Sequence, residues 1–307
     1  MEFFKTQTKV PFMQQRFRAF IFSTICIIAS ILSIYLHGLT MSLDFTGGHQ
    51  VQLQFEKPVP LEKIRQNLNF KQQIGLQTIG NARSILLRVP YSKESAQSHQ
   101  LRAHITKKLP HATIEQISFI GPQIGAALLL DGINAMAIAL LITMAYITYR
   151  FEYRFAISAM VALLHDPIIT LGIFSFFSVE FDIISLAGIL TILGYSLNDT
   201  IVVYDRVREN HAKNPKMSAS AIVDLAINDT LSRTIITSGL TLLAVLALCF
   251  YGGESLWGFS LALAIGIVVG TYSSIYVAGA LSVVIGLKPQ DLIKTPSTNP
   301  KVITDHV

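Results

Sequence analysis

Cysteine is scarce in this chain, and its two copies cannot build a framework of cross-links. Cys26 and Cys249 both lie in apolar stretches, where a free cysteine behaves as a small hydrophobic residue. Two cysteines alone cannot form a zinc site, and no disulfide pattern is visible. A glycine-rich loop ending in lysine, which would cradle nucleotide phosphates, is also missing. The sequence therefore predicts no metal, no cofactor and no enzymatic activity of the nucleotide-hydrolysing kind.

Charged side chains are scarce as well. Only 14% of the 307 residues are charged, 51% are hydrophobic, and the mean hydropathy is +0.50. This balance excludes a soluble domain and predicts a multi-pass α-helical membrane protein embedded in a lipid bilayer. Six apolar stretches reach spanning length. We predict spans at 17–36, 124–149, 155–177, 183–205, 231–251 and 256–285, the last five forming one transmembrane region over 123–287.

The basic residues of the short loops between the predicted spans all fall on one side of the membrane. Lys5, Lys9, Arg16 and Arg18 form the basic flank at the start of the first span. That span is too long for a signal-peptide core and is interpreted as an uncleaved anchor. Arg150 follows the second span, on the same side of the membrane. The preference of basic loops for the inner side predicts a cytoplasmic N-terminus over 1–16 and a cytoplasmic tail over 288–307. The net charge of +5 then belongs to these segments, and no nucleic-acid surface is predicted.

Residues 37–122 are predicted to form a small folded domain outside the cytoplasm. Val51, Leu53 and Phe55 alternate with glutamines, as in a half-buried strand. Strand and helix patterns then follow in the order βαββαβ, a ferredoxin-like α+β arrangement. We predict these elements at 51–55, 61–68, 74–79, 84–89, 92–109 and 113–120, with a turn at Gly80-Asn81.

Asp199 is an acidic residue inside the fourth predicted span, next to Asn198. A charged Asp near mid-membrane costs at least about 2.5 to 3.5 kcal/mol, so such a residue is usually paired, protonated or functional. Arg233 enters the fifth span from the cytoplasmic side and could reach a similar depth. The two residues are either a structural ion pair or a switch in which Arg233 controls a titrating Asp199. We favour the switch, because ionisable groups inside membranes so often mark ion paths.

Asp166 forms a second polar centre with His165 in the third span, about 15 Å in from the start of that span at helical rise. Two interpretations stay open: Asp166 is a relay carboxylate beside Asp199, or a structural group that is hydrogen-bonded between helices. Pro167 removes one backbone donor and predicts a kink.

Small residues recur at every fourth position of the sixth span. Such a stripe lets membrane helices approach closely, so we interpret it as a packing surface. Its members include Gly258, Ala262, Gly266, Gly270 and Ser274.

Two motifs carry a resemblance to a known family. Leu43-Asp-Phe-Thr-Gly-Gly48 follows the first span, and Gly194-Tyr-Ser-Leu-Asn-Asp-Thr200 lies in the fourth. Together they resemble the SecF members of the SecD/SecF family, whose fold is similar to that of the RND transporter superfamily. Further likeness covers four stretches: Phe151-Glu-Tyr-Arg154, His165-Asp166, Arg233 to Gly239, and Gly270 to Tyr276. One departure is Pro167, since a β-branched residue commonly follows this Asp in the family.

The resemblance implies a subunit of the bacterial inner membrane that promotes protein export and is coupled to proton movement. Its implied partners are SecD, the SecYEG channel with SecA, YajC and an unfolded preprotein. In the family's proposed mechanism Asp199 would accept the proton and Arg233 would be its charged partner. The family signature corresponds to Asp44, Phe45, Thr46, Gly47 and Gly48; it is either a hinge or partner contact, or a plain turn into the following strand.

Two other classes of protein compete with this interpretation. An intramembrane aspartyl protease needs two facing carboxylates, but Asp205 is six residues after Asp199 and about 240° round the same helix. An RND-type exporter of small molecules would use the same proton chemistry. Such exporters carry two large outer loops and about twelve spans, whereas one outer domain and six spans are predicted here, so the exporter alternative would be a half-unit.

Overall fold

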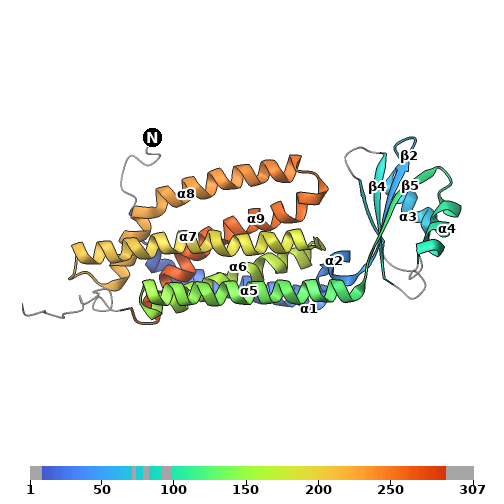
Figure 1. Ribbon diagram of the computed structural model, residues 1–307. Helices are drawn as coiled ribbons and strands as arrows, with labels where there is room; N and C mark the ends of the chain where they lie inside the picture. Colours follow the sequence, from blue (N-terminus) through green and yellow to red (C-terminus); the bar gives the residue numbers. More distant parts are fainter. Residues whose placement is uncertain (1–8, 71–73, 79–82, 92–97, 288–307) are drawn as a thin grey trace, which may run out of the picture.

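The computed structural model describes residues 9–70, 74–78, 83–91 and 98–287. Within these residues, long helices form a bundle, and a small domain with a β-sheet lies at one end of it (Figure 1). The predicted turn at Gly80-Asn81 and the predicted tail over 288–307 lie outside the described residues, as do 1–8 and 92–97.

The bundle contains six helical segments that are long and apolar enough to cross a membrane. A short 3-10 turn, η1 (Phe12–Gln15), precedes the first of them. The last segment is interrupted by a π-helical stretch, η2, which the sequence did not predict. The segments are α1 (Arg16–His37), α5 (Pro122–Arg150), α6 (Tyr153–Phe176), α7 (Ile183–Lys213), α8 (Ala219–Tyr251), and α9 (Glu254–Ser273) continued by η2 (Ser274–Gly279) and α10 (Ala280–Val284).

Two helices extend well past the predicted spans. α7 continues to Lys213 instead of stopping at 205, and α8 begins at Ala219 instead of 231. Ser218 fixes the start of α8, because its side chain accepts a hydrogen bond of 3.3 Å from the backbone N–H of Ala221. Arg233 consequently lies far inside a continuous helix, and not in a first turn.

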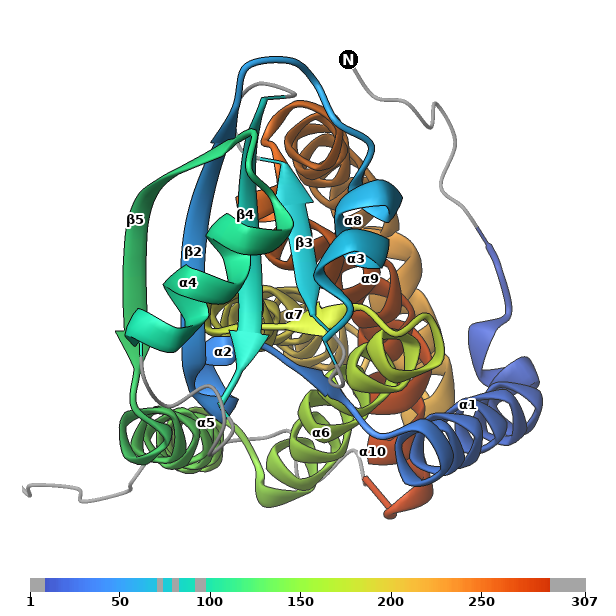
Figure 2. The same cartoon turned by 90° about the vertical axis from the view of Figure 1, so that its right-hand side faces the viewer.

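The small domain confirms the predicted βαββαβ order. Its strands β2 (Gly48–Phe55), β3 (Gly75–Thr78), β4 (Ser84–Pro90) and β5 (Ala112–Ile120) form an antiparallel sheet in the order β3-β4-β2-β5. α3 (Leu61–Leu68) and α4 (Ser98–Lys108) cover the face of the sheet that is turned away from the bundle (Figure 2). The core between sheet and helices contains Val51, Leu53, Ile64, Leu87 and Ile105.

A short junction ties this domain to the bundle. β1 (Thr40–Met41) pairs in parallel with β6 (Glu180–Phe181), which lies between α6 and α7. α2 (Leu43–Thr46) follows β1, and its Phe45 stacks on Phe181 with ring centroids 5.7 Å apart. Asp44 Oδ2 accepts a hydrogen bond of 3.3 Å from the backbone N–H of Ile183, at the start of α7. The signature is therefore a short helical turn that contacts β6 and the start of α7 and leads directly into β2.

The glycines of this junction touch neighbouring backbone. Gly47 and Gly48 have φ angles of 74° and 147°, a region that favours glycine. A Cβ on Gly48 would lie 2.3 Å from the carbonyl oxygen of Val89, and one on Gly125 would lie 2.5 Å from that of Phe45. Thr46 also contributes, because its hydroxyl donates to the carbonyl of Ser42 at 3.0 Å. These contacts hold α2 between the sheet and α5.

α6, α7 and α9 form the middle of the bundle and are its most buried spanning helices. α1, α5 and α8 lie outside them and leave most of their surface uncovered by this chain (Figure 1). The polar residues of the middle helices therefore meet one another away from the outer surface.

Candidate functional site: two carboxylate centres in the bundle

Asp199 lies on α7 with its side chain almost fully buried. Its Oδ2 atom accepts a hydrogen bond of 3.4 Å from the hydroxyl of Ser238 on α8. The Ser238 oxygen in turn accepts from the hydroxyls of Tyr195 at 3.3 Å and Thr271 at 2.9 Å. Three helices thus meet at Ser238, which the sequence did not single out. We call Asp199, Tyr195, Ser238 and Thr271 the Asp199 centre.

Arg233 does not contact Asp199 directly. It lies on α8 five residues before Ser238, it is exposed, and it makes no ion pair in the described part of the chain. Asn198 is exposed too, and among the described residues its side chain makes no hydrogen bond. The structure therefore brings Asp199 and Arg233 onto neighbouring helices without joining their charges.

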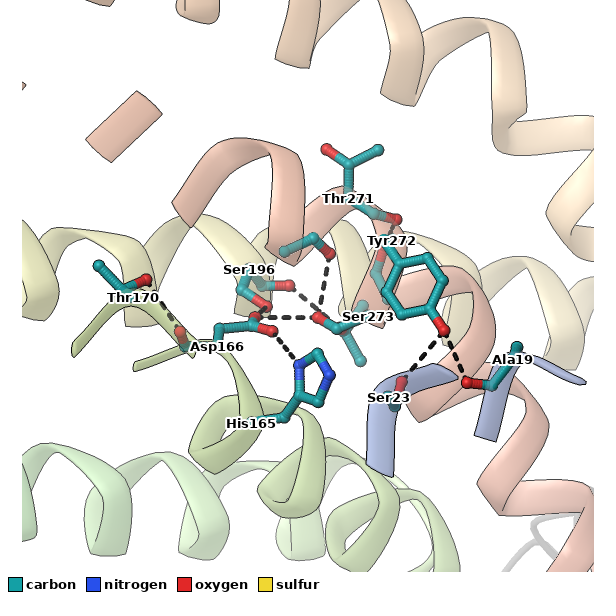
Figure 3. Close-up of polar contacts among 12 residues, drawn as sticks. Ala19, Ser23, His165, Asp166, Thr170, Ser196, Thr271, Tyr272 and Ser273 are labelled. Atoms are coloured by element: carbon teal, nitrogen blue, oxygen red, sulfur yellow. Dashed lines mark hydrogen bonds and ion pairs between the residues drawn. The ribbon is translucent and has the colours of Figure 1, made fainter. Parts of the chain in front are cut away.

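Asp166 lies on α6 and is fully buried. Its Oδ2 atom accepts from the hydroxyl of Ser196 on α7 at 2.6 Å and from that of Ser273 on α9 at 2.9 Å. Its Oδ1 atom lies 2.9 Å from Nδ1 of His165 (Figure 3). The hydroxyl of Thr170 adds a bond of 2.9 Å to the Asp166 carbonyl. We call Asp166, His165, Ser196 and Ser273 the Asp166 centre.

His165 and Tyr272 connect the Asp166 centre to α1. Their rings stack with centroids 6.3 Å apart. The hydroxyl of Tyr272 donates to the carbonyl of Ala19 at 2.8 Å and lies 3.0 Å from the hydroxyl of Ser23 (Figure 3). Nε2 of His165 is buried without a hydrogen-bond partner in the described part of the chain. Pro167 follows this centre inside α6, which runs on through it to Phe176.

The small residues of α9 lie against α7. A Cβ on Gly258 would lie 2.1 Å from the hydroxyl oxygen of Ser185, and one on Gly266 would lie 2.2 Å from Ile192. Gly270 and Ala262 face α7 less tightly: a Cβ on Gly270 would lie 3.2 Å from Ser196, and one on Gly188 would lie 3.2 Å from Ala262. Ser274 differs, since its hydroxyl donates to the Thr271 carbonyl of its own helix at 3.0 Å.

The hydroxyl groups that complete both centres lie in the stretches that carry the family resemblance, but the sequence did not predict that they pair with Asp166 and Asp199. Ser196, Ser238, Thr271 and Ser273 lie among many other hydroxyl residues of the apolar spans, and only the order and rotation of the helices selects them. Within the described residues, no group of three His, Cys, Asp or Glu side chains could hold a metal ion. Both centres consist of a buried carboxylate and hydroxyl groups from neighbouring helices that are joined by hydrogen bonds.

The fold and the site define a multi-pass α-helical membrane protein with a ferredoxin-like domain at one end and two buried carboxylates in its bundle. Residues 100–288 match the family described as protein export membrane protein SecD/SecF, C-terminal, and residues 33–59 match the SecD/SecF GG motif. The chain belongs to this family of protein-export membrane proteins, and its function is that of a protein translocase subunit.

Similar proteins cover nearly the whole chain. A protein translocase subunit SecF from Vibrio alginolyticus is 43% identical over 296 residues, which are 94% of each chain. Another from Desulfurispirillum indicum is 44% identical over 89% of this chain and 91% of its own. The crystal structure of SecDF, a translocon-associated membrane protein from Thermus thermophilus, matches with a TM-score of 0.79 at 34% identity. That match covers 92% of this chain but only 39% of the SecDF chain.

Proposed function

We propose that this translocase subunit couples proton movement through its bundle to protein export, with Asp199 accepting the proton and Arg233 as its charged partner. The observation that carries the proposal is the environment of Asp199: a buried carboxylate whose hydrogen bond comes from a neutral serine and not from a cation. A carboxylate held this way is not locked in one charge state, as a tight ion pair would be. Neutralising Asp199 would then remove the negative charge that attracts the exposed Arg233 on the neighbouring helix.

Asp166 is the second carboxylate of the proposed proton pathway. It receives two hydroxyl donors and faces His165, so it is held between three helices. We assign it to the same proton pathway as Asp199. Asn198 is the exposed polar neighbour through which water or a partner helix would reach Asp199.

The proposed partner in the membrane is SecD. The matched SecDF chain is more than twice as long as the part that this chain covers, which supports a partner of comparable size. The exposed Arg233 supports it too, because a charged residue on a spanning helix favours a protein or water-filled neighbour over lipid. SecYEG with SecA, YajC and an unfolded preprotein complete the proposed assembly, in which the subunit promotes release or pulling of the exported chain.

The proposed location is the bacterial inner membrane, with both termini in the cytoplasm. The end of α7 and the start of α8 lie at the end of the bundle opposite the sheet domain (Figure 1). Arg206 and Arg208 belong to the last turns of α7, Arg150 ends α5, and Arg154 is in the first turn of α6. The preference of basic residues for the inner side supports this orientation. A small-molecule exporter would use the same chemistry, but likeness to translocase subunits over 94% of the chain favours export of proteins.

The test is export of a secreted reporter in cells depleted of the native protein. Complementation with Asp199→Asn or Arg233→Met should leave as much unexported precursor as no complementation, at normal membrane levels of each variant. Asp205→Asn is the matched control: this carboxylate lies on the same helix but pairs with Arg150 at 3.0 Å near the bundle end, and it should export normally. Normal export with Asp199→Asn would overturn the proposed role of Asp199.

A further inference from the structure

The hydroxyl of Ser238 lies within hydrogen-bond distance of three side chains, those of Asp199, Tyr195 and Thr271. It has one proton to donate and two lone pairs to accept with. While Asp199 is ionised, that carboxylate is only an acceptor, so Ser238 donates to it and accepts from Tyr195 and Thr271. The donor proton and both acceptor lone pairs of the Ser238 hydroxyl are then engaged in hydrogen bonds.

Protonation of Asp199 would change this arrangement. A protonated carboxyl becomes a donor, and when it donates to Ser238 the serine proton must find another acceptor. The hydroxyl of Thr271 lies 2.9 Å away, and it has a second acceptor of its own, the Ile267 carbonyl at 2.7 Å. The proton of Thr271 can therefore point either to Ser238 or to the backbone of α9. When Asp199 donates to Ser238 and Ser238 donates to Thr271, the Thr271 proton points to the Ile267 carbonyl.

We propose that Thr271 is a positioning residue that transmits the charge state of Asp199 along α9 to Asp166, an inference that rests on the proposed function. Hydroxyls that bond back to the carbonyl four residues earlier bend helices, so the choice made by Thr271 changes the geometry of α9 locally. Two residues on, the single proton of Ser273 is shared between Asp166 Oδ2 at 2.9 Å and the Gly270 carbonyl at 3.1 Å. A change at Thr271 alters that balance.

The helix is built for such a change at this position. The π-helical stretch η2 begins directly after Ser273, and π-bulges within α-helices are frequent at functional sites. Between the two hydroxyls, Tyr272 points to α1, where it bonds Ala19 and lies beside Ser23. Thr271, Tyr272 and Ser273 thus contact Ser238, α1 and Asp166 from three consecutive positions of one helix. Figure 3 shows the contacts of Tyr272 with α1 and of Ser273 with Asp166.

Four ionisable side chains lie near the two carboxylates in the described part of the chain. Asp199 has Tyr195 on its own helix and Arg233 on α8; Asp166 has His165 on its own helix and Tyr272 from α9. A competing route runs within α7, because Ser196 lies one turn before Asp199 and also donates to Asp166. The experiment must separate that route from the one through α9.

The experiment is infrared difference spectroscopy of the full chain in lipid vesicles. The Asp166 carboxyl band is identified by its loss in Asp166→Asn, and its position is compared between chains with Asp199 and with Asp199→Asn. We expect this replacement to shift the Asp166 band in the otherwise unchanged chain, in Thr271→Ser, which keeps the hydroxyl, and in Ser196→Ala, the control that removes the route within α7. The shift should be lost in the isosteric Thr271→Val and in Ser273→Ala.

Two results would overturn the inference: no shift in the otherwise unchanged chain, or an equal shift in Thr271→Val and Ser273→Ala. Because the band is read without export, the inference and the proposed function fail separately. Normal export with Asp199→Asn removes the proposed function whatever the band does. If Asp199→Asn blocks export but does not shift the Asp166 band, the coupling through α9 is wrong and the proposed function stands.

Discussion

Gly48 lies where a side chain would collide with the neighbouring strand. Its φ of 147° demands glycine, and so does the carbonyl oxygen of Val89, which is 2.3 Å from the place that a Cβ would take. The Leu43 side chain, at 2.8 Å, closes the other side. A single missing methyl group is thus what lets α2 lie against the sheet.

We expect Gly48→Ala to lower the free energy of unfolding by about 1 to 3 kcal/mol, the usual cost of overpacking, with backbone strain in addition. Thermal unfolding in detergent measures it. Gly121→Ala is the matched control in the same junction, because its Cβ would meet nothing closer than a Phe119 ring atom at 4.0 Å. Equal stability of Gly48→Ala and the unsubstituted chain would contradict the close approach.

At the scale of elements, the contact between α7 and α9 depends on Gly258 and Gly266 of α9. A Cβ on Gly266 would lie 2.2 Å from Ile192, a side chain that is itself buried. We expect Gly266→Val to separate the helices and to weaken the hydrogen bonds of Thr271 and Ser273, which lie one to two turns further along α9. Reduced resistance of the purified chain to heat and a fall in export should follow together.

Gly239→Ala is the control for that substitution. This glycine lies in α8 with nothing within 4 Å of a Cβ. Its replacement by a better helix former should therefore keep or slightly raise stability, by at most about 1 kcal/mol, and leave export unchanged. Normal packing of Gly266→Val, measured as unchanged thermal unfolding, would show that α9 does not need its small residues at this position.

Local patterns explain which elements the sequence could predict. The alternation of Val51, Leu53 and Phe55 identified β2 because it depends only on neighbouring residues, and the helix at Leu61–Leu68 has the predicted bounds. Asp166 and Asp199 stood out as carboxylates in apolar spans, and both are buried. Their partners could not be predicted, because hydroxyl residues are common in these spans and pairing depends on which helices are neighbours. The π-helical stretch has no local signal either.

At the scale of the whole molecule, an ion pair links the sheet domain to the bundle. Nη1 of Arg88 on β4 lies 2.6 Å from Oε2 of Glu180 on β6. The two side chains keep 22% and 39% of their surface exposed, so the pair contributes at most about 1 kcal/mol. It acts together with the backbone pairing of β1 and β6, and its effect is on orientation more than on stability.

We expect Arg88→Gln to broaden the distances between a spin label at Lys107 on α4 and one at Ala187 on α7, two exposed positions. The exchange of charges in Arg88→Glu with Glu180→Arg should restore the narrow distribution, because it rebuilds the pair in reverse. An unchanged distribution in Arg88→Gln would mean that β1 and β6 alone orient the domain.

The buried side of α1 carries serines, and their partners come late in the chain. Ser23 meets Tyr272, Ser33 donates to Ser175 at 3.2 Å, and Ser30 lies against Gly172. During synthesis α1 enters the membrane long before α6 and α9 have been translated. Until then its hydroxyls lack these partners and face lipid or another protein. The order of translation and the order of assembly therefore differ here, and the membrane part closes only when its last span has been inserted.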